Sequence, residues 1–307
     1  MISIYFSHPV CQLHNNGSEH PEAAERLSRI EDTLIEKRLL DFVLVKEPRA
    51  ATVQDILRVH SDWHWHHLLD SVNPDKIVHL DNDTNLSKDS IDAALYASGA
   101  VLDSVDALLK GDAGVAFCNV RPPGHHAEVD RAMGFCLINH VAIGAAYAID
   151  NYGLERVAIL DFDVHHGNGT ESYARQQPKL LFASSYEEDI YPFPTLENPQ
   201  ENLIKMPLKR GDGDEAFLNA WRSQVWPRLR EWQPQLIILS AGFDAHRWDP
   251  LAGLDVSEAG FNQWTHELRA LADELCGGKV ISVLEGGYEL TSLALSVVAH
   301  FKALTDL

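Results

Sequence analysis

The sequence of this protein predicts an α/β fold in which helices flank a parallel sheet. Short apolar segments alternate along the chain with longer segments whose apolar residues recur at helical spacing. Most of the short segments are apolar throughout, which is typical of strands buried on both faces of a parallel sheet. The 307 residues contain no linker, internal repeat or low-complexity stretch, so we expect a single domain over residues 1–307.

Seven segments are predicted to be strands because they are short, apolar and rich in β-branched residues. In chain order they are Ile2–Ser7, Val115–Val120, Val157–Phe162, Leu180–Ser184, Leu203–Pro207, Leu236–Ser240 and Val280–Leu284. Six longer segments are predicted to be helices, and several begin with Ser, Thr, Asp or Asn as a candidate N-cap. In chain order they are Glu22–Glu36, Val53–Ser71, Ser87–Lys110, Asn139–Asn151, Asp214–Glu231 and Ser257–Leu275.

The composition limits the kinds of binding partner and the cellular compartment that we expect for this protein. The formal net charge of −20 argues against nucleic-acid binding, favours solubility and would attract cationic substrates. The four cysteines are widely spaced without a C-x-x-C pair, as expected for reduced thiols in the cytosol. The first residues lack the features of a signal peptide, and no apolar stretch is long enough to cross a membrane. We therefore expect a soluble cytoplasmic protein, and a homo-oligomer remains open.

A run of acidic and imidazole side chains follows the strand Val157–Phe162. Because strand side chains alternate between faces, Asp161, Asp163 and His165 are expected to project on the same side. Aspartate and histidine are good zinc ligands, and three protein ligands leave a coordination position open for water. Asp244 follows another predicted strand and is the best candidate for the third ligand. The same donor set would also accept Fe²⁺.

Tandem imidazoles and a phenol lie in two other loops that follow predicted strands. His125 and His126 end the segment Arg-Pro-Pro-Gly-His-His, and hydrolysis of an amide needs a group that takes and returns a proton. Asp161 and Asn168 are suitable partners that would give the two imidazoles different pKa values. Tyr288 follows two glycines, and its phenol could stabilise a developing oxyanion from the side opposite the metal.

Five segments together resemble the zinc-dependent histone deacetylase family, including its bacterial amidohydrolase members. They are Arg121–Ala127, Gly134–Asn139, Asp161–Gly169, Ser240–Leu254 and Leu284–Leu290. Their order and spacing match over nearly the whole chain. The resemblance implies the arginase–deacetylase fold, in which helices flank an eight-stranded parallel sheet.

The resemblance also implies roles for individual residues. Zinc would be held by Asp163, His165 and Asp244, with His126 as the proton shuttle and His125 as its electrostatic partner.

Further implied roles concern the substrate tunnel and a second cation. Tyr288 would polarise the acetyl carbonyl, and Gly134, Phe135 and Tyr191 match the walls of an acyl-lysine tunnel. The family also carries a structural potassium ion near the zinc strand. Its ligands here would be Asp161, Asp163, His165 and Ser184.

Features within the family favour its class II branch. Asn168 stands where some members carry aspartate, and Glu285 precedes Gly-Gly-Tyr. An amide cannot raise the pKa of its histidine as a carboxylate would, so His126 should be mostly neutral near pH 7. Leu251 occupies a position at which the polyamine-selective branch carries glutamate, which favours an acyl-lysine substrate. Glu19 and Glu22 are expected either to start the helix Glu22–Glu36 or to attract a cation at the tunnel rim.

Three functions are weighed. The first is a zinc amidohydrolase that removes acetyl or related acyl groups from lysine side chains of a protein or peptide. The second is a deacetylase of acetylpolyamines or other small acylated amines, and the third is a catalytically silent protein that binds acyl ligands. A binuclear arginase is disfavoured because Gly167 and Asn168 do not supply further ligands. His60, His64 and His67 share a helical face but are expected to have structural or surface roles.

Overall fold

The structure, a computed structural model, describes residues 2–194 and 200–307. Within the described residues, eight strands form one sheet in the order β2-β1-β5-β10-β9-β6-β7-β8, and every neighbouring pair is parallel. The strands are β1 (Ser3–Phe6), β2 (Leu44–Lys46), β5 (Val115–Cys118), β6 (Val157–Asp161), β7 (Leu180–Glu187), β8 (Leu203–Leu208), β9 (Leu236–Ala241) and β10 (Val280–Leu284). The predicted fold class, an eight-stranded parallel α/β sheet, is confirmed.

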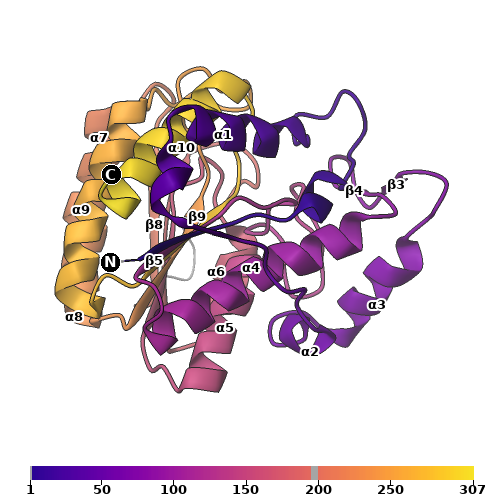
Figure 1. The fold of residues 1–307 in the computed structure, drawn as a ribbon, viewed down its shortest axis with the longest axis horizontal. Coiled ribbons are helices and arrows are strands. Elements are labelled where there is room, and N and C mark those ends of the chain that lie inside the picture. Colours follow the sequence, from indigo (N-terminus) through magenta and orange to yellow (C-terminus); the bar gives the residue numbers. More distant parts are fainter. Residues whose placement is uncertain (1, 195–199) are drawn as a thin grey trace.

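Two helical layers cover the sheet (Figure 1). One layer consists of α1 (Glu25–Glu36), α7 (Asp214–Ala220), α8 (Trp226–Trp232), α9 (Glu258–Cys276) and α10 (Leu290–Thr305). The other consists of α4 (Ser90–Lys110), α5 (His140–Tyr152) and α6 (Asn168–Ala174). Because both faces are covered, the central strands are buried on both sides, which explains their continuous apolar sequences.

Two of the predicted helices are interrupted. The segment predicted as one helix from Val53 to Ser71 forms α2 (Val53–Ile56) and α3 (Asp62–Ser71). Ser61 ends the break, because its hydroxyl accepts a hydrogen bond from the His64 amide and starts a new helix. The predicted helix Asp214–Glu231 contains a π-helical turn (Trp221–Val225) between α7 and α8.

Other elements escaped the sequence analysis. They are β2, α6, α10, the hairpin strands β3 (Val78–His79) and β4 (Asn85–Leu86), and the 3-10 helices Pro9–Gln12 and Leu39–Phe42. Strand β2 is exposed and only three residues long, so it lacks the length of a central strand although Leu44 and Val45 are apolar. None of the helices in the described part of the chain is long and apolar enough to cross a membrane.

Parallel pairing brings the carboxyl ends of the strands to one edge of the sheet, on the right of Figure 1. The last residue of β6, Asp161, pairs with Ser184 of β7 and Ser240 of β9, so β6 and β9 end at about the same level while β7 continues to Glu187. The loops that follow β5, β6, β9 and β10 therefore leave the sheet side by side. The chemically reactive residues predicted from the sequence lie in these loops.

Candidate active site

Three side chains from two strand-end loops form a cluster that could hold a metal ion. One ligand atom from each of Asp163, His165 and Asp244 lies within 4.8 Å of the other two. The Nδ1 atom of His165 lies 3.1 Å from both Asp163 Oδ1 and Asp244 Oδ2. Both carboxylates are buried, whereas the His165 side chain keeps 12% of its surface exposed. The three residues predicted to ligate zinc are therefore neighbours, and the cluster is open on the imidazole side.

Two glycines make room for this cluster. A Cβ atom on Gly242 would lie 2.0 Å from Asp163 Oδ2, and one on Gly286 would lie 2.1 Å from Asp244 Oδ2. The Gly286 amide also donates a hydrogen bond of 2.8 Å to Asp163 Oδ2. The glycines that follow β9 and β10 thus allow the backbone to approach two buried carboxylates closely.

The electrostatics of the cluster suit a cation. Burial opposes charge on His165, but hydrogen bonds and charge from Asp163 and Asp244 outweigh it and raise its pKa to about 10. Burial and the nearby charge of Asp163 raise the pKa of Asp244. Two carboxylates in one buried space repel each other. A divalent cation would neutralise their formal charge of −2.

The tandem histidines lie beside the cluster and have different partners. His125 Nδ1 lies 2.9 Å from Asp161 Oδ2, and His126 Nδ1 lies 2.8 Å from the amide oxygen Asn168 Oδ1. Burial lowers the pKa of both imidazoles, but the charges of Asp161, Asp163 and Glu285 raise that of His125 well above its ordinary value.

The pKa of His126 is not raised in the same way. Its pKa lies well below the ordinary value because burial and the charges of His125 and His165 all lower it. The Asn168 amide nitrogen donates to Glu128 Oε1 at 2.7 Å, so the amide oxygen is the atom that faces His126. Since that oxygen can only accept, the hydrogen of neutral His126 is on Nδ1, and Nε2 carries the lone pair.

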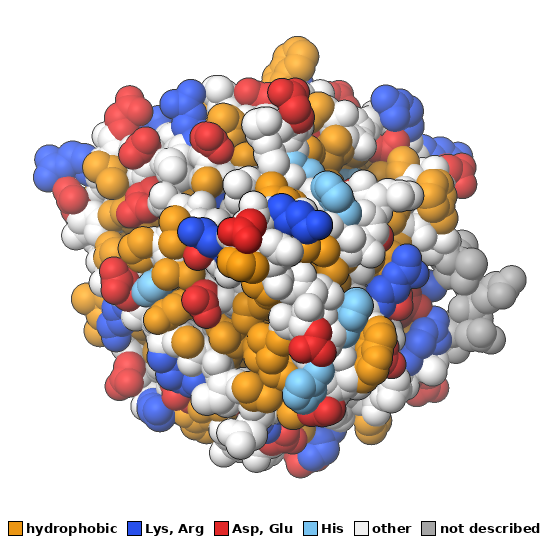
Figure 2. Space-filling model, turned by 90° about the vertical axis from the view of Figure 1, so that its right-hand side faces the viewer, with side chains coloured by type: hydrophobic (Ala, Val, Ile, Leu, Met, Phe, Trp, Pro, Cys, Tyr) orange, Lys and Arg blue, Asp and Glu red, His pale blue; other side chains and the backbone are white. Residues whose placement is uncertain are grey.

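A cavity of about 160 Å³ opens next to His126 and His165. Its lining residues are Asp83, His126, Gly134, Phe135, His165, Tyr191, Leu251 and Tyr288. The rings of Phe135 and Tyr288 are nearly perpendicular with centroids 5.8 Å apart, and Tyr191 is edge-on to His126 at 5.2 Å. All four predicted tunnel residues, together with the predicted phenol, line the same cavity. Figure 2 shows the corresponding face of the molecule, where hydrophobic, acidic and histidine side chains are exposed together.

Two acidic residues at the site were missed as functional residues. Asp83 lines the cavity from the loop between β3 and β4, far in sequence from the recognised motifs. Glu285 was noted only as a class feature, yet its buried Oε2 accepts hydrogen bonds from the amides of Gly124, at 2.6 Å, and His125, at 3.2 Å. Its position directly after a buried strand was the available signal.

The predicted potassium ligands lie together but remain a prediction. Asp161 and Ser184 are neighbours across β6 and β7, and both side chains are buried. Asp161 Oδ1 accepts a hydrogen bond from the Asp163 amide at 3.2 Å, and Ser184 Oγ lies 3.0 Å from Nδ1 of His166.

The expectations for Glu22 were wrong. It neither starts α1, which begins at Glu25, nor faces the rim, because it is completely buried between Arg26 and Arg121.

The histidines at positions 60, 64 and 67 have structural or surface roles, as expected. His60 and His64 are buried against the backbone carbonyls of Glu128 and Leu137, each at 2.9 Å. His67 stacks on the exposed ring of Trp63.

Comparison with known proteins places the fold and the site in context. Residues 20–304 match the family described as histone deacetylase domain. The chain is 41% identical to type-2 histone deacetylase 2 of Dictyostelium discoideum over 73% of its own length and 14% of that protein. It is 33% identical to a probable deacetylase of Archaeoglobus fulgidus over 94% of this chain and 82% of that one. The crystal structure of the HDA15 HD domain is similar with a TM-score of 0.92 and 32% identity, over 99% of this chain and 90% of that chain.

Proposed function

We propose, from the premise that this chain belongs to the histone deacetylase family, that it removes acetyl or related acyl groups from lysine side chains with the help of zinc. Family membership makes the chain a hydrolase that acts on amides. One observation carries the finer proposal. A single cavity is lined by a member of the three-residue ligand cluster, by His126 and by the phenol of Tyr288.

Asp163, His165 and Asp244 would hold the zinc ion. The two carboxylates and the imidazole match its preferred donors, and their charge of −2 balances that of the ion. When bound, zinc supplies a Lewis acid for the amide carbonyl and lowers the pKa of water. Fe²⁺ would fit the same donors. Asp161 and Ser184 would contribute to the structural potassium site beside it.

His126 would carry the proton in this reaction. Its Nδ1–H is donated to Asn168, so Nε2 can accept a proton from the attacking water. The water oxygen forms the new bond to the acyl carbon, the C–N bond breaks, and His126 returns the proton to the departing amine. His125, held by Asp161, would remain charged and stabilise the negative charge that develops nearby.

Tyr288 would stabilise the oxyanion. Tyr288 lines the same cavity as His126, and a phenol O–H can donate a hydrogen bond to the carbonyl oxygen as negative charge develops there. The Tyr288 backbone is fixed by its amide, which donates to Asp249 Oδ2 at 2.7 Å. Asp249 Oδ1 accepts from the Leu251 amide at 2.9 Å, so the phenol and one tunnel wall share an anchor.

The lining of the cavity favours an acyl-lysine over a polyamine. Phe135, Tyr191 and Leu251 supply apolar surface for the methylene chain of a lysine side chain. Leu251 itself offers no counter-charge to a second ammonium group, and Asp83 is the single carboxylate among the described residues that line this cavity. We therefore propose an acylated lysine in a protein or peptide as the substrate.

A substrate panel tests the proposal. The zinc-loaded protein is given an acetyl-lysine peptide, acetylputrescine and acetylspermidine, each with and without a zinc chelator, and released acetate is measured. We expect the highest kcat/KM on the peptide and loss of turnover with the chelator. Turnover of acetylspermidine far above the peptide would identify a polyamine deacetylase instead. No turnover of any of the amides would point to a protein that only binds acyl ligands.

A further inference from the structure

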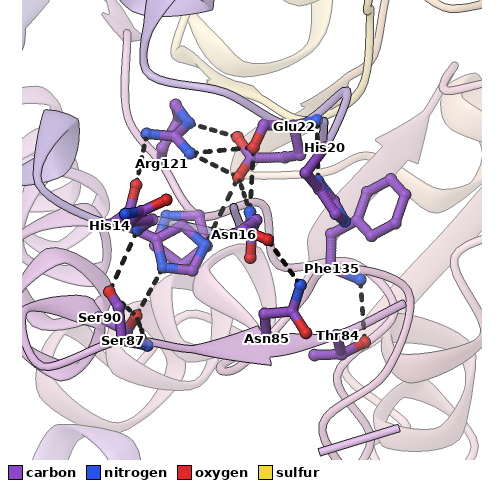
Figure 3. A network of polar contacts seen from close by, with 12 residues as sticks. His14, Asn16, His20, Glu22, Thr84, Asn85, Ser87, Ser90, Arg121 and Phe135 are labelled. Carbon is purple, nitrogen blue, oxygen red and sulfur yellow. Dashed lines mark hydrogen bonds and ion pairs between the residues drawn. The ribbon is translucent and has the colours of Figure 1, made fainter. Parts of the chain in front are cut away.

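A carboxylate outside the cavity connects the two loops that carry the proposed catalytic groups. Glu22 lies in the loop before α1, and its side chain is completely buried between Arg26 and Arg121, which are buried as well. Arg26 Nη1 donates to Glu22 Oε1 at 3.1 Å, and Arg121 Nη2 donates to Glu22 Oε2 at 2.7 Å. Figure 3 shows Glu22 between Arg121, His14 and Asn16.

Arg26 connects Glu22 with the loop that carries Tyr288. Its Nε donates to the carbonyl of Gly287 at 2.6 Å, and its Nη2 donates to the carbonyl of Glu285. Its guanidinium carbon lies 5.0 Å from the centroid of the Tyr288 ring. One arginine therefore fixes two carbonyls just before Tyr288 and also contacts the ring itself.

Arg121 connects Glu22 with the loop that carries the tandem histidines. It begins the segment Arg-Pro-Pro-Gly-His-His, and its Nη1 donates to the carbonyls of Cys11, at 3.1 Å, and His14, at 3.2 Å. At the other end of the same segment, the Glu285 carboxylate accepts hydrogen bonds from two backbone amides. The backbone carbonyl of Glu285 in turn accepts a hydrogen bond from Arg26. Contacts thus run in a closed circuit from one loop to the other and back.

The charge of Glu22 is what holds this circuit together. Burial alone would raise the pKa of Glu22, but Arg121, His14 and Arg26 lower it to about 2, so the side chain is ionised. Buried ion triads are often no more stabilising than apolar side chains of equal volume, and their best-attested use is to fix one arrangement of chain segments. A shared counter-ion between two arginines sets the position of each relative to the other.

We propose that Glu22 is a positioning residue that fixes the loop carrying Tyr288 and the loop carrying His125 and His126 relative to each other. The inference rests on the proposed function, because it gives Tyr288 and His126 their roles in amide hydrolysis. Phe135 packs on the ring of His20, which binds the backbone amide of Glu22 and not its carboxylate. Loss of the Glu22 charge should therefore lower kcat more than it changes KM, because misplacement of the reacting groups acts on the transition state.

The test is Glu22→Gln, with Arg269→Gln as a matched control. Arg269 is a nearly buried arginine that donates to the carbonyl of Gly278, before β10 and far from the site. We expect E22Q to lower kcat on the acetyl-lysine peptide by about 10-fold or more with KM within about 3-fold, while R269Q keeps kcat. In a Y288F background, the effect of E22Q on kcat should shrink to less than about 3-fold, because the two changes disrupt the same interaction.

Each outcome decides the inference. A folded, zinc-loaded E22Q with the wild-type kcat, or an effect that adds fully to that of Y288F, would overturn it and leave the proposed function intact. Should E22Q not fold, Glu22→Asp replaces it, because the shorter side chain keeps the charge but withdraws the carboxylate from Arg26 and Arg121. A lower kcat at an unchanged melting temperature then supports the inference, and an unchanged kcat overturns it. Absence of amide turnover by the wild type would refute the proposed function itself.

Discussion

At the scale of single residues, the atom that faces Nδ1 of each tandem histidine contributes to the difference between their pKa values. A carboxylate oxygen of Asp161 faces His125, and an amide oxygen of Asn168 faces His126. Both are hydrogen-bond acceptors of similar geometry, but only the carboxylate stabilises a charged imidazole through its own charge. The pKa of His125 is therefore raised and that of His126 is lowered, although the two residues are adjacent in the chain.

Replacement of Asn168 by aspartate should shift the pH dependence of catalysis. A carboxylate beside Nδ1 favours the protonated form of His126 and raises its pKa. Since the neutral imidazole acts as the base, the acidic limb of the kcat/KM profile should move to higher pH, by about one unit or more. Profiles of the wild type and N168D on the acetyl-lysine peptide measure this shift. Superimposable acidic limbs would contradict the assignment of His126 as the base.

At the scale of secondary-structure elements, a neutral histidine joins three parts of the core. His300 of α10 is completely buried, with Nδ1 at 2.7 Å from Thr265 Oγ1 of α9 and Nε2 at 2.9 Å from Ser282 Oγ of β10. Burial lowers the pKa of His300 to about 3. Two hydroxyl groups face the ring nitrogens of this imidazole, and burial without a counter-charge favours the uncharged ring.

The stability contributed by His300 should therefore be lost in acid. Its folded-state pKa lies below the unfolded value of about 6.5. The contribution is thus fully present above pH 6.5 and declines as pH falls toward 3. Relative to His300→Gln, which does not titrate, the wild type should lose about 2 kcal/mol of unfolding free energy between pH 6.5 and pH 5. Urea unfolding of both proteins at several pH values measures the difference, and a pH-independent difference would contradict it.

The central elements were predictable from the sequence, and the peripheral ones were not. Buried strands such as β6 and β10 read as short apolar runs because helices cover both faces of the sheet. Strand β2 is exposed and only three residues long, so its two apolar residues, Leu44 and Val45, are too few to indicate a strand. Helix α6 starts at Asn168, inside a Gly-Asn-Gly segment that signals a turn rather than a helix.

The candidate site divides in the same way. The ligand cluster and the tandem histidines were found because each lies within a short, dense motif directly after a strand. The role of Glu22 was missed because its partner Arg121 is 99 positions away, and Arg26 reaches the Glu285 carbonyl across 259 positions. Such contacts depend on the packing of distant loops, which local spacing does not encode.

At the scale of the whole molecule, the ligand cluster links the folding equilibrium to the metal. Asp163 and Asp244 are buried together, and their mutual repulsion opposes folding in the absence of a cation. An ion that binds only the folded chain stabilises it by mass action, by about 2.7 kcal/mol at 100 times its dissociation constant.

Zinc should therefore raise the melting temperature of the chelator-treated protein. For a chain of this size, the stabilisation corresponds to a shift of about 5 °C. Thermal unfolding with and without added zinc measures it, and D163N/D244N serves as the control that should not respond. A melting temperature that is independent of zinc in the wild type would contradict a structural contribution of the ion.

The place of β10 in the sheet has a consequence for biosynthesis. This strand enters between β5 and β9, so the earlier part of the chain yields two separate half-sheets, β2-β1-β5 and β9-β6-β7-β8. The tandem histidines follow a strand of the first half-sheet, and the ligand cluster follows strands of the second. A nascent chain on the ribosome grows at about 5–20 residues per second, and it cannot join the halves until residue 284 has left the exit tunnel. The candidate site therefore cannot be complete before β10 has been synthesised.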